Sequence, residues 1–108
     1  MTISAFHQLA LSFPGTAATP HFDRTAFKVV GRRIFATLHE GSETVNLKLS
    51  PVDQSIYSQI TTQLIYPVNN KWGVQGWTTF ELRQMDPQLM QEAVETAYRQ
   101  ALENPRKK

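Results

Sequence analysis

Three segments between residues 27 and 49 alternate apolar and polar side chains, and two glycine-containing reversals, Gly31-Arg32 and Gly41-Ser42, separate them. Such alternation is typical of half-buried β-strands, and glycine as the first of two loop residues suits a type II′ hairpin turn. The chain is therefore expected to fold around an antiparallel sheet with one apolar face. Its 108 residues leave room for one core, and the absence of cysteine excludes disulfides and thiolate metal sites.

The register of the two hairpins divides the strand residues between two faces, because a slip by one residue would reverse every side chain. We place Val30 opposite Arg33 across the first turn and Glu40 opposite Glu43 across the second. The predicted core face consists of Phe27, Val29, Ile34, Ala36, Leu38, Val45, Leu47 and Leu49. The open face carries Lys28, Phe35 and Lys48, flanked by Thr37 and Asn46.

Helical patterns surround this predicted sheet. Apolar residues at helical spacing predict an amphipathic helix over residues 3–13, ended by Pro14-Gly15. Ser50-Pro51 and Asp86-Pro87 each have the form of an N-cap followed by proline at the first helical position. The apolar stripes that follow them are Val52, Ile56, Tyr57 and Ile60, and then Leu89, Met90, Ala93, Val94, Ala97, Tyr98, Ala101 and Leu102.

The remaining segments complete a two-layer α+β domain. Residues 16–20 and 61–75 are predicted to be irregular, while residues 21–30 form one strand or two and residues 76–85 form another. We expect an antiparallel sheet of four or five strands that packs one face against the N-terminal and C-terminal helices.

The charge of the chain is unevenly distributed. The last three residues supply three of the eleven cations, so residues 1–105 carry eight cations against nine acids. Residues 24–48 nevertheless hold five cations against two acids, a local excess of three. We expect residues 1–104 to form a single domain and residues 105–108 to be a disordered basic tail, because Pro105 ends the last helix.

Motifs of catalysis and metal binding are missing from the sequence. There is no phosphate-binding glycine loop, nucleophile elbow or dinucleotide fingerprint, and His7, His21 and His39 lack the spacing of a helical metal pair. His21 and Asp23 could orient an imidazole, but no nucleophile accompanies them, and a hydrogen bond at a turn or strand edge is the expected role. We predict no enzymatic activity, no cofactor and no bound metal.

The N-terminal segment bears on localisation. Residues 1–22 are free of Lys, Arg, Asp and Glu, but no cationic region precedes an apolar run, so we do not expect them to be a secretory signal. No stretch approaches the ~18 apolar residues of a membrane span. A cytoplasmic protein of bacterial type, without membrane contact, is expected.

The segment Trp72-Gly73-Val74-Gln75-Gly76-Trp77 is the most distinctive in the chain. Further motifs, in order, are Pro14-Gly15, Pro20-His21-Phe22, Ile34-Phe35-Ala36-Thr37-Leu38 and Leu47-Lys48-Leu49-Ser50-Pro51. Together they resemble the MmcQ/YjbR family of small bacterial proteins over nearly the whole chain. This resemblance implies a CyaY-like arrangement of antiparallel sheet and helices, and a DNA-binding function with a proposed double-wing arrangement.

Three functions remain open. The first is weak, largely sequence-independent nucleic-acid binding, with phosphates held by Arg24, Lys28, Arg32, Arg33, Lys48 and Lys71 and bases by Phe35 or Trp72. The second is protein interaction or homodimerisation through the open sheet face and the uncharged stretch from Gln54 to Asn70. The third is small-molecule binding between the sheet and the tryptophan segment. Convergence of the cations on one surface would favour the first.

Overall fold

The computed structural model describes residues 1–103 and confirms the α+β class. One antiparallel sheet has the strand order β1-β2-β3-β4-β6-β5, with six strands instead of the four or five expected. The elements are α1 (Ile3–Leu11), β1 (Thr16–His21), β2 (Arg24–Val29), β3 (Ile34–His39), β4 (Thr44–Lys48), α2 (Pro51–Ile60), β5 (Ile65–Pro67), α3 (Lys71–Val74), β6 (Trp77–Glu81), the 3₁₀ helix η1 (Leu82–Gln84) and α4 (Pro87–Glu103). The prediction for residues 105–108 falls outside the described residues.

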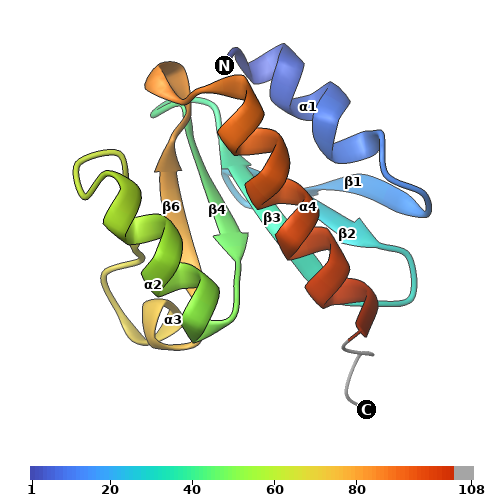
Figure 1. Ribbon diagram of the computed structural model, residues 1–108. Helices are drawn as coiled ribbons and strands as arrows, with labels where there is room; N and C mark the ends of the chain where they lie inside the picture. The colour runs from blue at the N-terminus through green and yellow to red at the C-terminus, as the bar shows by residue number, and fades with distance from the viewer. Residues whose placement is uncertain (104–108) are drawn as a thin grey trace.

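The three longer helices lie on one face of the sheet, with α4 between α1 and α2 (Figure 1). Phe6 of α1 meets Phe27 of β2 edge to face at 5.5 Å, and Tyr57 of α2 meets Phe80 of β6 at 6.1 Å. The predicted stripe of α4 packs between them, and its residues from Met90 to Ala101 on that stripe are buried. The expected two-layer arrangement is confirmed, because the sheet places its apolar face against these helices.

The helix starts follow from capping side chains. The Thr2 hydroxyl accepts a hydrogen bond from the Ala5 N–H, and the Ser50 hydroxyl accepts one from the Asp53 N–H, both at 3.0 Å. The Asp86 carboxylate likewise accepts from the Leu89 N–H at 3.0 Å. Each cap satisfies an N–H group that has no partner within its own helix, so the predicted starts are confirmed.

The second hairpin has the predicted register. Ala36 pairs with Leu47 and Leu38 with Val45, and all four side chains are fully buried. The Glu43 N–H donates to the Glu40 carbonyl at 3.2 Å, which closes the turn where it was expected.

The first hairpin turns one residue earlier than predicted. The Arg32 N–H donates to the Val29 carbonyl at 2.8 Å, and Gly31 has a φ of +81°. The central turn residues are therefore Val30-Gly31, with glycine at the position that needs a positive φ. The predicted Gly31-Arg32 loop, with Val30 opposite Arg33, is wrong.

A β-bulge follows in β3 and exchanges two side chains between the faces. Phe27 pairs with Ala36, but the next residue, Lys28, pairs with Ile34. Phe35 is thus the extra residue, and a bulge interrupts the strict alternation of a strand. Phe35 is fully buried in the core, while Ile34 lies on the same face as Lys28. The predictions of Ile34 as core and Phe35 as open-face residue are wrong.

Two segments predicted to be irregular contain regular structure. Residues 16–21 form β1, which pairs with β2, and residues 65–67 form β5, which pairs with β6. The one-turn helix α3 also lies within the predicted loop.

Among the described residues no helix combines the length and apolar character needed to cross a membrane.

Candidate functional site

The face of the sheet opposite the helices carries three of the predicted cations. Residues that pair across antiparallel strands point to the same face. Arg24 pairs with His21, Lys28 with Ile34, and Lys48 with Trp77. These side chains therefore share the face that α1, α2 and α4 leave uncovered, which we call the open face.

A cleft of about 440 Å³ lies on the open face. It is lined by His21, Arg24, Ile34, Thr37, Asn46, Val68, Asn70, Trp72 and Trp77. Residues far apart in the sequence, from His21 of β1 to Trp77 of β6, meet in this cleft. The cleft is mostly apolar, with a few polar groups and two indole rings, which is the usual composition of a ligand site.

Arg24, which lines this cleft, has an unsatisfied donor. Its Nη1 atom is buried and has no hydrogen-bond partner among the described residues. A buried donor without a partner destabilises a protein by about 1–3 kcal/mol, so native structures rarely retain one. The guanidinium presents its donors in a fixed plane and suits an acceptor such as a phosphate, a carboxylate or the edge of a base.

The backbone of residues 70–77, which carries Trp72, packs closely against neighbouring carbonyl groups at its two glycines. A Cβ atom on Gly73 would lie 1.9 Å from the Val68 carbonyl oxygen, and one on Gly76 would lie 1.8 Å from that of Leu49. Gly76 also has a φ of +110°. The backbone thus approaches its neighbours more closely than any larger residue permits.

Side-chain amides fasten the same segment. The Gln54 amide of α2 donates to the Gly73 carbonyl at 2.9 Å and to the Trp77 carbonyl at 3.1 Å. The Asn70 side chain accepts from the Trp72 N–H at 2.8 Å and caps α3. Trp72 is therefore a ring on a supported backbone, although 49% of its surface is exposed.

The cations beside the cleft influence one another and the rings. Burial lowers the pKa of Lys48, and the charge of Arg33 lowers it further. Arg33 is thus close enough to Lys48 for the two charges to repel. The ammonium of Lys71 lies 5.7 Å from the centre of the Trp72 ring, at the distance of a cation–π contact.

Near the β1–β2 turn an aspartate contacts a histidine. The Asp23 carboxylate lies 3.2 Å from His39 Nε2, and His39 Nδ1 lies 2.7 Å from the Ser42 hydroxyl. The ring of His21 instead contacts that of Phe22. The Asp23 carboxylate therefore has His39 of β3 as its partner.

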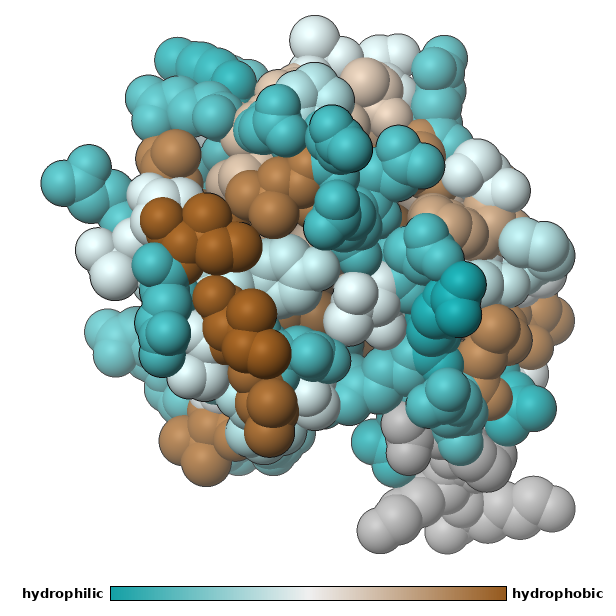
Figure 2. Space-filling view, viewed as in Figure 1, coloured by the Kyte–Doolittle hydropathy of each residue, from teal (hydrophilic) through white to brown (hydrophobic). Residues whose placement is uncertain are grey.

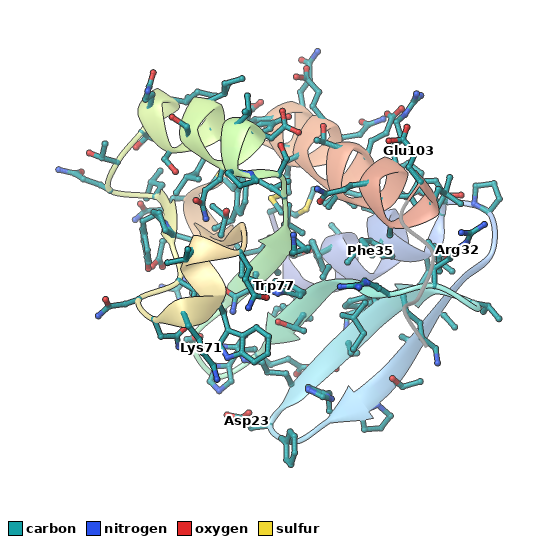
Figure 3. The ribbon with its side chains drawn as sticks, turned by 90° about the horizontal axis from the view of Figure 1, so that it is seen from below. Asp23, Arg32, Phe35, Lys71, Trp77 and Glu103 are labelled. Carbon is teal, nitrogen blue, oxygen red and sulfur yellow. The ribbon has the colours of Figure 1, made fainter. Side chains whose placement is uncertain are left out.

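Not all of the predicted binding residues reach the cleft. Arg32 lies at the opposite end of the molecule from Lys71, and Phe35 lies between the sheet and α4 (Figure 3). Phe35 is fully buried and meets the Tyr98 ring, so its predicted contact with a base is wrong. Of the predicted set, Arg24 and Trp72 line the cleft, Lys28 and Lys48 share its face, and Arg33 and Lys71 lie beside Lys48 and Trp72.

Several lining residues were not predicted as site residues. Trp77 falls in the strand predicted over residues 76–85, and Val68 and Asn70 fall in the segment predicted to be irregular. Gly73, Gly76 and Asn70 are the sequence features that could have indicated these lining residues. They are typical of a short capped turn beside large rings. Nothing in the sequence places that turn against β1 and β2.

One group of exposed apolar side chains lies on α2. Figure 2 shows brown side chains in a row along α2, on the helical side of the molecule. The row includes Val52, Ile56 and Ile60, which are 70%, 55% and 55% exposed. The open face, where homodimerisation was one of the alternatives, carries Arg24, Lys28 and Lys48 beside the cleft with its two indole rings. In residues 1–103 no group of three His, Asp or Glu side chains could hold a metal ion.

Comparisons with known proteins agree with this architecture. The model of the YjbR family matches residues 11–100. A solved structure, protein DR2400 of Deinococcus radiodurans with a DUF419 domain, has a similar fold with a TM-score of 0.76. The two chains are 20% identical over 89% of this chain and 75% of that one. No curated protein matches the sequence.

Proposed function

This chain belongs to the YjbR family, and from that premise we propose that it binds DNA through the open face of its sheet. The observation that carries the proposal is the convergence of Arg24, Lys28 and Lys48 on one face that no long helix covers. Residues 1–105 carry a net charge of −1, eight cations against nine acids, so this gathering is local.

The electrostatics of the face favour a polyanion. Burial lowers the pKa of Lys48, and repulsion by the charge of Arg33 lowers it further. A phosphate between them would replace that repulsion with attraction and release counterions from the nucleic acid. Such contacts carry no sequence information, so binding is weak and largely independent of sequence.

The first test is a salt series on the full chain with a single-stranded oligonucleotide. The matched variants are Lys28→Gln combined with Lys48→Gln on the open face, and Arg99→Gln as control. Arg99 pairs with Glu95 on α4, away from the open face. Each phosphate contact on a single strand contributes about 0.7 to the log–log slope, so the double variant should reduce the slope by roughly 1.4 and the control should not.

A second arm separates the folded surface from the basic end of the chain. Residues 106–108 supply three cations. Their deletion changes the formal net charge of the chain from +2 to −1. Binding that survives this deletion and still depends on Lys28 and Lys48 supports the open face. Binding that vanishes on deletion, or that Lys28 and Lys48 do not affect, contradicts the proposal.

A further inference from the structure

We infer that the cleft on the open face holds one unpaired nucleobase, stacked on Trp72 and hydrogen-bonded by Arg24. This inference rests on the proposed DNA binding and deepens it, because it makes the ligand a single strand. Phosphate contacts alone would not distinguish a duplex from a single strand. The cleft adds a site that only a base free of its partner can enter.

Two tryptophan rings suit the cleft to a nucleobase. Trp72 and Trp77 both line the cleft, and Trp72 keeps half of its surface exposed on a backbone fixed by Gly73 and Gln54. A supported indole ring that faces a cleft is a stacking platform, and every base has a π face that suits it. In a duplex the bases are stacked on each other and are not available to such a ring.

The second argument is the donor set around the ring. Arg24 lines the cleft together with both tryptophans, and its Nη1 atom is buried without a hydrogen-bond partner among the described residues. The carbonyl oxygen of the Asn46 side chain already accepts from the Thr79 hydroxyl at 2.8 Å, which leaves its amide group as a donor. The cleft therefore offers donors to a ligand that carries acceptors, as the keto oxygens of a base do.

The third argument is the position of the cleft among the cations. Lys71 lies over the Trp72 ring, and Lys28 and Lys48 share the sheet face. A strand whose base enters the cleft would have its flanking phosphates near these ammonium groups. Stacking and charge then act on adjacent parts of one ligand, which is the usual design of single-strand sites.

The experiment compares two single strands of about ten nucleotides, a length within the range for one binding surface, of which one is oligothymidylate and the other abasic. Binding is followed by anisotropy of a labelled strand and by quenching of tryptophan fluorescence. The thymidine strand should bind roughly 5- to 150-fold more tightly than the abasic strand, the range expected for one stacked base. Only the thymidine strand should quench the tryptophan fluorescence.

Four variants locate the effect. Trp72→Ala and Arg24→Gln should each remove most of the advantage of the thymidine strand. Trp72→Phe should retain most of it, because a ring remains, and Arg99→Gln should leave it unchanged. Thermal unfolding of each variant establishes that the fold is intact before binding is compared.

The outcomes separate this inference from the proposed function. If both strands bind equally and binding still depends on Lys28 and Lys48, the cleft is not a base site although DNA binding stands. If neither strand binds at low salt, both proposals fail. A duplex of equal length that binds as tightly as the thymidine strand also contradicts the inference.

Discussion

The ring of Phe35 meets the ring of Tyr98 edge to face beneath α4, with centroids 6.0 Å apart and planes at 78°. The contact exists because Phe35 is the extra residue of a bulge that turns its side chain into the core. It ties the third strand of the sheet to the last helix. The neighbouring Ile34 is left to line the cleft on the other face.

This packing predicts unequal effects of two neighbouring truncations. Phe35→Ala removes a fully buried ring and should destabilise the protein by about 3–5 kcal/mol. Ile34→Ala, at a half-buried position of the cleft, should have a smaller effect. Urea unfolding of both variants checks this, and a larger loss for Ile34→Ala would contradict the assignment of faces.

Ile34 and Phe35 show how far alternation in a sequence assigns residues to the two faces of a sheet. Alternation assigned most strand residues correctly, including Phe27, Ala36 and Leu47, because burial of one face imposes a period of two. At Ile34 and Phe35 two apolar residues are adjacent, so either can occupy the core. The choice follows from the turn at Val30-Gly31 and from Tyr98, which lies far along the chain.

A second prediction concerns the backbone beneath Trp72. Gly76→Ala must place a Cβ against the Leu49 carbonyl and hold alanine at a positive φ. We expect a loss of more than about 1 kcal/mol in the free energy of unfolding. Gly41→Ala is the matched control, because its Cβ would meet only the His39 ring, and at 3.2 Å. Equal losses in the two variants would show that close packing at Gly76 is not what holds the segment.

The cleft depends on contacts that the sequence does not display. The segment from residue 61 to 75 has weak local preferences, with Pro67 in a three-residue strand and Gly73 in a four-residue helix. It becomes regular because β6 pairs with β5 and Gln54 donates to the carbonyls around α3. Such tertiary contacts override propensity, so the cations were found from sequence while most of the cleft was not.

The third prediction is a pH dependence from Lys48. Burial and the charge of Arg33 lower its pKa in the folded state, so between that value and the ordinary value the unfolded chain binds more protons. The free energy of unfolding should therefore rise as pH increases through this window. Lys48→Met should be more stable than the parent at neutral pH and should lack that part of the rise. Urea unfolding at a series of alkaline pH values checks both points, and a slope that is identical in the variant would contradict the assignment.

The fourth prediction concerns the apolar row on α2. Ile56→Gln alters a side chain that is 55% exposed, so the free energy of unfolding should change by no more than about 0.5 kcal/mol. Tyr57→Ala should cost more, because the Tyr57 ring packs on Phe80. Thermal unfolding at several protein concentrations is the measurement. A loss in Ile56→Gln that depends on concentration would contradict an uncovered row and indicate a second copy of the chain there.

Nucleic acid should contact the open face of the sheet and not its helical side. Titration of the labelled full chain with a single-stranded oligonucleotide, followed by amide and indole NMR shifts, tests it most directly. We expect the signals of Arg24, Lys28, Asn46 and the Trp72 indole to move together while those of α1 and α4 stay in place. Shifts confined to the helices, or no shifts at low salt, would contradict it.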